Sequence, residues 1–167
     1  MPVTLPSDAP QTLGEAFARI NSVTAPTMTD LKVMVLVEAA GQTLYEKSAE
    51  GAEDARVKAL LIENGHEEMK HARRAAEAIK ILTGEDFPAP AAADNPYLTG
   101  HIPVAAITPE GLRKTAESEF NGDALYARWA DSLDNADAAE LLRANGREET
   151  DHGHRLLEAA AILEAQA

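Results

Sequence analysis

Residues 60–74 read LLIENGHEEMKHARR, and residues 141–155 read LLRANGREETDHGHR. When the second stretch is laid on the first, eight positions are identical, and these include a Glu-Glu pair and the histidine that follows it. The same shift also pairs four upstream residues, with no gap. These pairs are Glu38 with Glu119, Gly41 with Gly122, Leu44 with Leu125, and Tyr45 with Tyr126. The chain therefore consists of two related halves.

The spacing of apolar residues around both stretches predicts helices. Residues three, four and seven positions apart share one face of a helix, so Glu68 and His71 lie on the same side as Leu61 and Ala72. The same reasoning places the equivalent residues of the second half, and the upstream glutamate of each half, on apolar faces. Six polar residues are thus predicted to point inward: Glu38, Glu68, His71, Glu119, Glu149 and His152.

Four long helices are predicted, at residues 30–49, 53–82, 109–133 and from 136 nearly to the C-terminus. Asp30 is expected to cap the first helix, Gly84 to end the second, and Thr108 to cap the third, with Pro109 in its first turn. Alternating apolar and polar runs typical of strands are missing from the sequence. The fold class is therefore expected to be all-α.

The lengths of the links predict how the helices are arranged. Short links make each pair an antiparallel hairpin, whereas residues 84–107 are long enough to cross the length of a four-helix bundle. Residues 1–28 hold four prolines and one short helical phrase, residues 12–20. We expect an N-terminal arm over residues 1–28 and a bundle over residues 29–167.

Composition excludes several classes of protein. Cysteine is absent, which excludes disulfides, thiolate catalysis and cysteine-held iron–sulfur clusters on this chain. A net charge of −13 argues against binding to nucleic acid. The sequence shows neither a signal peptide nor an apolar run long enough to span a membrane, so we expect a cytoplasmic protein with no membrane span.

Four inward carboxylates would repel one another and resist burial in a core. Divalent cations resolve this conflict. A carboxylate from each of two helices plus a Glu-x-x-His pair from each of the other two is the ligand pattern of a di-iron or di-manganese bundle. The separation of Glu38 from Glu68 equals that of Glu119 from Glu149, so both halves should present ligands at the same depth. Two iron ions are the expected cofactor, although oxygen and imidazole ligands also suit manganese or zinc.

In these six residues and in its helix order, the chain resembles the ferritin-like superfamily, and within it the rubrerythrin-like di-iron proteins. The resemblance covers residues 30–165. It implies that Glu38 and Glu119 are terminal ligands, that Glu68 and Glu149 bridge the metals, and that His71 and His152 supply nitrogen ligands. It also implies that reduced iron reacts with peroxide or dioxygen, with no catalytic residue beyond the metal ligands.

The chain departs from typical rubrerythrins in two ways. They carry a further glutamate three residues after the third-helix ligand, where this chain has Gly122. They also carry a cysteine-held rubredoxin iron, which this chain cannot hold. The resemblance therefore implies a separate electron donor protein.

Three other hypotheses stay open. The chain also looks similar to the hydroxylase of ubiquinone synthesis, which would make it a monooxygenase on an organic substrate, with residues 102–107 as candidates to line a channel. Iron binding or storage without catalysis is the second, and a metal-free structural bundle is the third. Storage would need a shell of many subunits around a mineral cavity. A homodimer is the expected partnership otherwise, because soluble proteins often form symmetric pairs.

Several further residues attract attention. Asp123 is a candidate to hydrogen-bond a metal ligand, in competition with Gln42, Asn64 and Asn145. Core filling is the favoured role of Tyr45 and Tyr126, and hydrogen bonds to the ligands or the relay of oxidising equivalents stay open as alternatives. Gly65 and Gly146 suggest a close approach of helices or a local distortion beside the ligands, and shared descent of the two halves explains them equally well. His66, His101 and His154 are outside the inward register and are expected at the surface.

Overall fold

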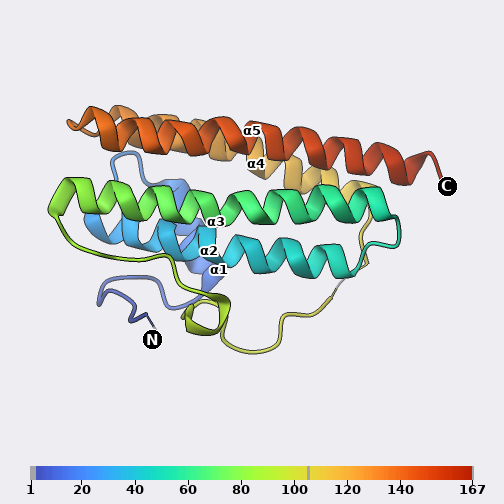
Figure 1. Cartoon of the computed structure of the whole chain (residues 1–167), viewed down its shortest axis with the longest axis horizontal. Coiled ribbons are helices and arrows are strands. Elements are labelled where there is room, and N and C mark those ends of the chain that lie inside the picture. Colours follow the sequence, from blue (N-terminus) through green and yellow to red (C-terminus); the bar gives the residue numbers. More distant parts are fainter. Residues whose placement is uncertain (1–2, 105, 167) are drawn as a thin grey trace.

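The computed structural model of the chain describes residues 3–104 and 106–166, and over these residues the fold is entirely helical (Figure 1). The helices are α1 (Leu13–Ser22), α2 (Met28–Glu50), α3 (Ala55–Thr83), the short 3-10 helix η1 (Ala92–Asp94), α4 (Pro109–Asp131) and α5 (Ala136–Glu164). No strand occurs among the described residues, so the predicted all-α class is confirmed. Within the same residues, no helix is long and apolar enough to cross a bilayer.

The four long helices run side by side as two pairs (Figure 1). α2 packs against α3, and α4 packs against α5, with a short turn joining the helices of each pair. Contact between the pairs is made mainly by α3 and α5. A groove opens between α2 and α4. The link from α3 to α4 runs along the length of the molecule (Figure 1).

Capping residues fix the ends of the helices, either through a side chain or through the backbone conformation of glycine. Gly84 ends α3 in the left-handed conformation with a φ of 75°, and the Thr108 hydroxyl accepts a hydrogen bond from the Gly111 N–H at the start of α4. The prediction for α2 was wrong, because Thr27 and not Asp30 is its N-cap. Asp30 lies three residues further on, where its carboxylate accepts hydrogen bonds of 2.8 and 2.6 Å from the Thr27 N–H and hydroxyl. Asp30 is therefore the second member of a capping box.

The N-terminal segment touches both hairpins. Ala16 and Ile20 of α1 are buried, and α1 packs on α2. The indole N–H of Trp129 on α4 donates a hydrogen bond of 2.9 Å to the carbonyl oxygen of Val23, just after α1. The α1 segment therefore spans the space between α2 and α4 at one end of the groove.

The apolar core is divided into two clusters of buried side chains. One cluster lies beside α1 and includes Met34 and Trp129. The other lies towards the α2–α3 turn and includes Leu61 and Leu156. A layer of buried glutamate, histidine and asparagine side chains separates the two along the helices. This layer holds the candidate site.

Candidate metal centre

Six titratable side chains from four helices meet in the polar layer. Glu38 comes from α2, Glu68 and His71 from α3, Glu119 from α4, and Glu149 and His152 from α5. Five of them are buried, with exposed fractions of 7% or less, and Glu119 is half-buried. The structure thus brings together all six residues that the helical period directs inward.

The six side chains form two overlapping groups of four ligand atoms. Within each group these atoms lie within 4.8 Å of one another, close enough to hold a metal ion. The first group is Glu38, Glu68, His71 and Glu149, and the second is Glu68, Glu119, Glu149 and His152. Because Glu68 and Glu149 belong to both groups, these two carboxylates lie between the two positions that a metal ion could take.

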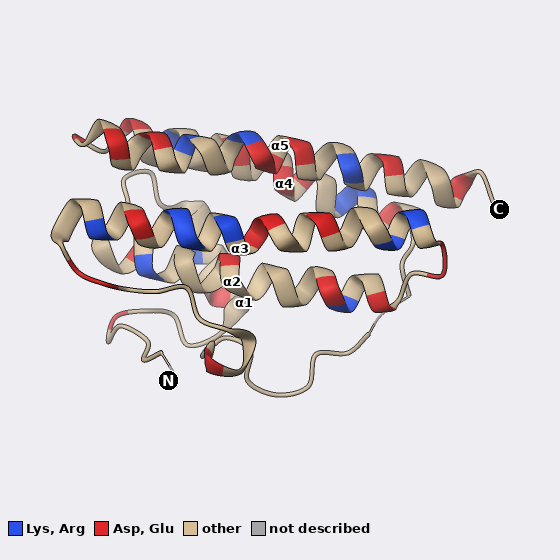
Figure 2. Ribbon diagram, in the orientation of Figure 1, with Lys and Arg blue, Asp and Glu red and all other residues tan. Residues whose placement is uncertain are grey.

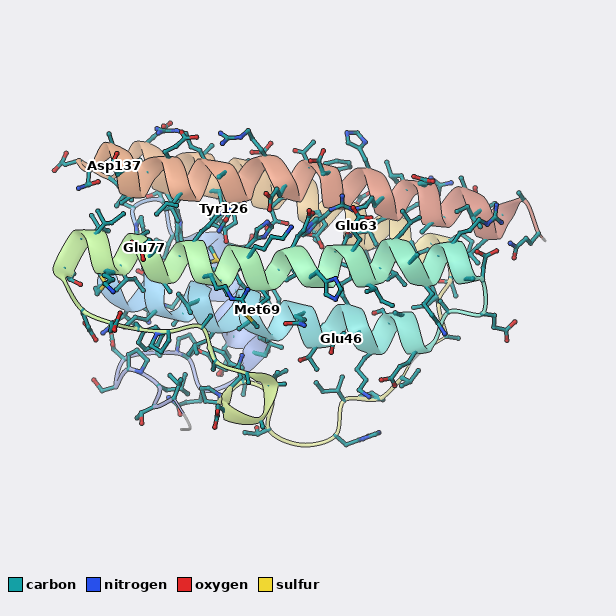
Figure 3. The ribbon with its side chains drawn as sticks, viewed as in Figure 1. Glu46, Glu63, Met69, Glu77, Tyr126 and Asp137 are labelled. Atoms are coloured by element: carbon teal, nitrogen blue, oxygen red, sulfur yellow. The ribbon has the colours of Figure 1, made fainter. Side chains whose placement is uncertain are left out.

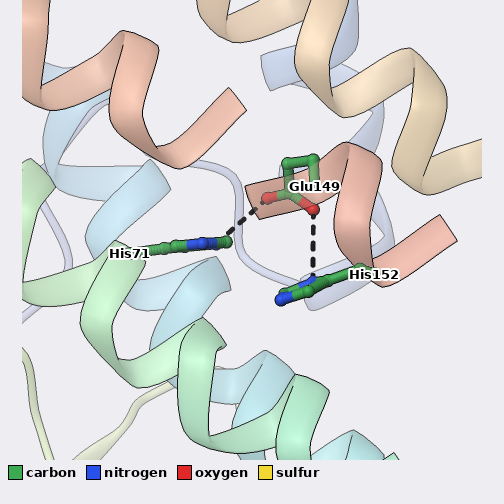
Figure 4. A group of neighbouring side chains, drawn as sticks. All are labelled: His71, Glu149 and His152. Carbon is green, nitrogen blue, oxygen red and sulfur yellow. Dashed lines mark ion pairs between the residues drawn. The ribbon is translucent and has the colours of Figure 1, made fainter. Parts of the chain in front are cut away.

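Both imidazole rings are held by one nitrogen and turn the other towards the carboxylates (Figure 4). Nε2 of His71 lies 3.0 Å from Glu148, and Nε2 of His152 lies 3.2 Å from Glu67. A carboxylate accepts hydrogen bonds, so Nε2 carries a proton, and Nδ1 is the nitrogen that offers a lone pair whenever the ring is neutral. The two Nδ1 atoms lie 3.1 and 3.5 Å from the two oxygens of Glu149.

Three buried atoms at the centre of the site lack a hydrogen-bond partner among the described residues. They are Nδ1 of His71, Nδ1 of His152 and Oε2 of Glu38. An unsatisfied buried polar group costs about 1–3 kcal/mol. Lone pairs that converge on one space from nitrogen and oxygen atoms are satisfied together by a metal cation, so the residues present fit a metal site.

An arginine–glutamate pair lies behind each histidine. Arg74 donates two hydrogen bonds of 2.8 Å to the carboxylate of Glu148, which contacts His71. Arg155 makes the equivalent contact with Glu67 on the other side of the site. Helical periodicity alone does not assign these charged residues to the site. The signal that could have found them is the repeat, since the shift that lays His152 on His71 also lays Glu148 on Glu67 and Arg155 on Arg74.

Two asparagines complete the support of the histidines. The Asn145 side-chain amide donates a hydrogen bond of 3.1 Å to the backbone carbonyl of His71. Asn64 does the same for His152, at 3.3 Å. Both asparagines are fully buried. Of the four residues considered for hydrogen-bonding a ligand residue, the two asparagines do so.

Asp123 and Gln42 lie outside this network. Asp123 accepts a hydrogen bond of 2.8 Å from the Thr150 hydroxyl and so joins α4 to α5 instead of supporting a ligand. Gln42 donates to Glu46 at 2.9 Å on the surface of α2. The histidines expected at the surface are indeed exposed: His66, His101 and His154.

The two tyrosines reach across from one hairpin to the other. The Tyr126 hydroxyl, which lies between the helices in Figure 3, donates a hydrogen bond of 2.7 Å to Glu38. Tyr45 donates in the same way to Glu119. Both rings fill the core, as expected, and the alternative that their hydroxyls hydrogen-bond the candidate ligands is observed as well. Each ring is buried, but its hydroxyl extends far enough to reach a carboxylate of the facing helix.

Glycines make room where the helices meet around the site. A Cβ atom at Gly41 would lie 2.8 Å from Oε2 of Glu68, and one at Gly122 would lie 3.3 Å from Cγ of Glu149. At Gly65 it would lie 3.0 Å from Cβ of Tyr45. The predicted close approach of helices is thus observed, and two of these glycines leave space for the shared carboxylates.

The charges of the site do not balance. Burial and the repulsion of nearby carboxylates raise the pKa of both Glu68 and Glu119 well above the usual value. Burial alone would lower the pKa of His71, but hydrogen bonds to carboxylates, Glu148 first, raise it to about 11. Burial, together with the positive charges of His71 and Arg155, lowers the pKa of His152. Without a metal, these shifts favour protonated Glu68 and Glu119 and a protonated His71, whereas divalent cations would favour ionised carboxylates and a neutral imidazole, so the site favours cations.

The carboxylates are reached through the groove between α2 and α4, which encloses about 700 Å³. All four of them line it: Glu38, Glu68, Glu119 and Glu149. Residues 102–107, which were considered as a channel lining, contribute none of its described residues. Ile107 packs instead against the apolar cluster near the α2–α3 turn, which keeps this segment away from the carboxylates.

The candidate ligands and the residues that hydrogen-bond them both suit a metal site. Buried His and Glu groups could hold a metal ion, and hydrogen bonds fix the ring nitrogens and carboxylate oxygens around it.

No family model, curated protein or solved structure matches this chain.

Proposed function

We propose that this chain is a ferritin-like, rubrerythrin-like protein that holds two iron ions and reacts them, when reduced, with peroxide or dioxygen. The observation that carries the proposal is the pair of four-atom groups that share Glu68 and Glu149. Two metal positions with two common carboxylates are the pattern of a carboxylate-bridged dinuclear centre.

Each residue has a place in this proposal. Glu38 and His71 would be the terminal ligands of one iron, and Glu119 and His152 those of the other. Glu68 and Glu149 would bridge them. The bound iron would supply the electrons that reduce the oxidant.

The chain's own residues would prepare the centre for that chemistry. Glu67 and Glu148 hold the imidazoles with Nδ1 facing the metal positions, and the two tyrosine hydroxyls hold the terminal carboxylates. Apolar clusters on both sides of the polar layer exclude water along the bundle. Oxidants would enter by the groove, from the carboxylate side.

Two features bear on the reaction that the proposed oxidoreductase would carry out. The sequence has no cysteine, so a separate electron donor protein would have to restore the reduced iron. The groove favours a second candidate function, a monooxygenase acting on an organic substrate, because its volume exceeds what peroxide or dioxygen requires.

The test begins with metal content. Protein purified from iron-supplemented cells is analysed for metals beside the double variant Glu68→Ala/Glu149→Ala. A second double variant, Glu46→Ala/Glu77→Ala, removes the same number of charges from positions of α2 and α3 outside the site, both labelled in Figure 3. The reduced iron form is then mixed with peroxide or dioxygen, and its oxidation is followed by absorbance.

We expect roughly two irons per chain in the natural protein and in the Glu46/Glu77 variant, with little in the Glu68/Glu149 variant. Rapid oxidation followed by turnover with a reductant would support an enzyme. Metal content below about half an ion per chain, even after anaerobic reconstitution, would refute the dinuclear centre. Large hollow particles loaded with iron would instead indicate storage.

A further inference from the structure

The groove between α2 and α4 is far larger than a small oxidant needs. Its volume of about 700 Å³ falls in the range of about 300–1,000 Å³ that is typical of sites for organic molecules. A water molecule, which is only slightly smaller than dioxygen or peroxide, occupies roughly 30 Å³ in the liquid. The groove therefore has room for a second reactant beside the carboxylates.

Apolar atoms make up most of the lining surface of this groove, although polar side chains contribute to it as well. α2 contributes Met34, Val37 and Leu44, and α4 contributes Leu125. Phe17 of α1 lies at the rim with 40% of its surface exposed, which makes it one of few large apolar side chains so exposed. An exposed aromatic beside an apolar hollow favours contact with an apolar ligand.

The shape of the groove favours a small molecule over a protein partner. α1 and the turn after it close one end, because Phe17 and Ile20 line the groove there and Trp129 is hydrogen-bonded to Val23. A helix from a second chain could not lie along a groove that is blocked in this way. A small organic molecule could enter from the open end, where hydroxyl side chains such as Ser118 line the rim.

Charge narrows the class of ligand further. The described lining residues include no lysine or arginine, and the floor consists of carboxylates. An anion would find no positive side chain and four negative ones. Two divalent metals on these carboxylates would make the floor close to neutral, which suits an uncharged ligand.

We infer that the groove binds a neutral, largely apolar organic molecule against the carboxylate face of the metal site, next to Glu38 and Glu119. This inference rests on the proposed function, because the metals would offset the charge of the floor. For the candidate monooxygenase function, it names the substrate class as neutral, largely apolar organic molecules. The ligand would lie on the opposite side of the site from the histidines and their arginine–glutamate pairs.

Two probes with the same ring system test it. Equilibrium dialysis measures the binding of neutral 2-naphthol and anionic 2-naphthoate to protein loaded with Zn²⁺, with Mn²⁺ or with no metal. The broadening of the 2-naphthol proton resonances by the Mn²⁺ form, relative to the Zn²⁺ form, reports how near the ligand lies to the metal. Leu44→Trp and Ser118→Trp fill the groove from opposite walls. Ile81→Trp is the control, at an exposed site on α3 outside the groove.

We expect 2-naphthol to bind with broadening by Mn²⁺, and 2-naphthoate to bind at least about tenfold more weakly. Both groove-filling variants should lose at least about tenfold in affinity for 2-naphthol, and Ile81→Trp should not. Equal affinity in all variants, preference for the anion, or, in protein that holds Mn²⁺, binding without broadening would overturn the inference.

The metal content of every sample separates this inference from the proposed function. Failure to bind Mn²⁺ or Zn²⁺ would contradict the proposed function. Dialysis on that metal-free protein would still test whether the groove binds the organic molecule. Loss of 2-naphthol binding in both filling variants would support binding in the groove, and unchanged binding would refute it.

Discussion

Each histidine of the site is oriented by a carboxylate from the opposite hairpin. Glu148 on α5 contacts His71 on α3, and Glu67 on α3 contacts His152 on α5. The arginine behind each glutamate keeps that carboxylate charged, and the pKa of Glu148 lies well below its usual value because of its hydrogen bonds to His71 and Arg74. The direction of Nδ1 therefore depends on residues that would not touch the metal.

Replacing Glu148 with glutamine tests this dependence. We expect Glu148→Gln to weaken metal binding by about 10–100-fold, because the amide loses the charge that orients the imidazole. Competition for Zn²⁺ with a chromogenic chelator at pH 7 measures the affinity. Glu46→Gln, on α2 away from the site, is the control. An affinity for Glu148→Gln within twofold of the control would contradict the role of Glu148.

The equivalent glycines Gly41 and Gly122 should respond differently to alanine. A Cβ at Gly41 would push directly on the carboxylate of Glu68, whereas at Gly122 the Glu149 side chain needs to give by only a few tenths of an ångström. Gly41→Ala is therefore expected to weaken Zn²⁺ binding more than Gly122→Ala, as measured by the same competition.

Gly14→Ala controls for the gain in helix propensity, because no atom counted among the described residues lies within 4 Å of the added Cβ. We expect it to raise the free energy of unfolding by about 0.5–1 kcal/mol without changing metal affinity. If Gly41→Ala bound metal as well as Gly14→Ala, Glu68 would have another way to reach its position.

The sequence predicts the candidate ligands better than the residues that surround them. A helical period states which side of a helix a residue occupies, and this suffices for Glu68 and His71. It does not state which residue of another helix lies opposite. A hydrogen bond from Tyr45 to a ligand was therefore only an alternative to core filling, with no partner named, and Glu148 was not assigned to the site. The partners of both depend on the spacing between hairpins, which no local pattern encodes.

At the scale of the elements, the start of α2 shows how a local signal can be misplaced. The helices themselves follow from periodicity and caps, and the observed ends of α3 and α4 agree closely with the prediction. At the start of α2, Thr27 and Asp30 are both good N-cap residues, and three positions separate them. Asp30 also accepts a hydrogen bond of 2.6 Å from Arg19, so it fastens α1 to α2. This tertiary contact is what the sequence could not supply.

Asp30 should make the stability of the fold depend on pH. Burial alone would raise its pKa, but hydrogen bonds from Thr27 and Arg19 lower it below its usual value. Its contribution is therefore complete above the unfolded-state pKa of about 4 and is lost as the pH falls through the folded-state pKa. We expect Asp30→Asn to cost roughly 1.5–3 kcal/mol at pH 7 and progressively less in acid.

Urea unfolding followed by circular dichroism, in the presence of a chelator, measures this difference between pH 7 and pH 3. Asp134→Asn, in the α4–α5 turn, is the control. A difference between Asp30→Asn and the natural protein that stays constant with pH would show that the carboxylate charge contributes nothing.

Over the whole molecule, negative charge is in excess both inside and outside. The net charge is −13, and acidic residues appear on each of the long helices, interspersed with basic ones (Figure 2). The buried layer concentrates four of the chain's carboxyl groups between the hairpins. Like charges oppose the compact state, so cations held in this layer should stabilise the fold.

Metal binding should accordingly raise the melting temperature. At a free metal concentration of 100 times Kd, a single site adds about 2.7 kcal/mol to the stability of the folded state. For a chain of this size, that corresponds to a rise in Tm of roughly 5–10 °C. Differential scanning calorimetry with Zn²⁺, and again after a chelator, measures it. Glu68→Ala/Glu149→Ala should show no rise, and a rise equal to that of the natural protein would place the bound metal elsewhere.

The two four-atom groups have a consequence for the ancestry of the chain. Each group takes three ligands from one hairpin and one glutamate from the other. The internal repeat makes the two hairpins equivalent, so two copies of a single hairpin, paired by a twofold axis between Glu68 and Glu149, would contain the same set of ligands. The site is thus one that a symmetric dimer of half-length chains could have completed before gene duplication and fusion joined them through residues 84–107.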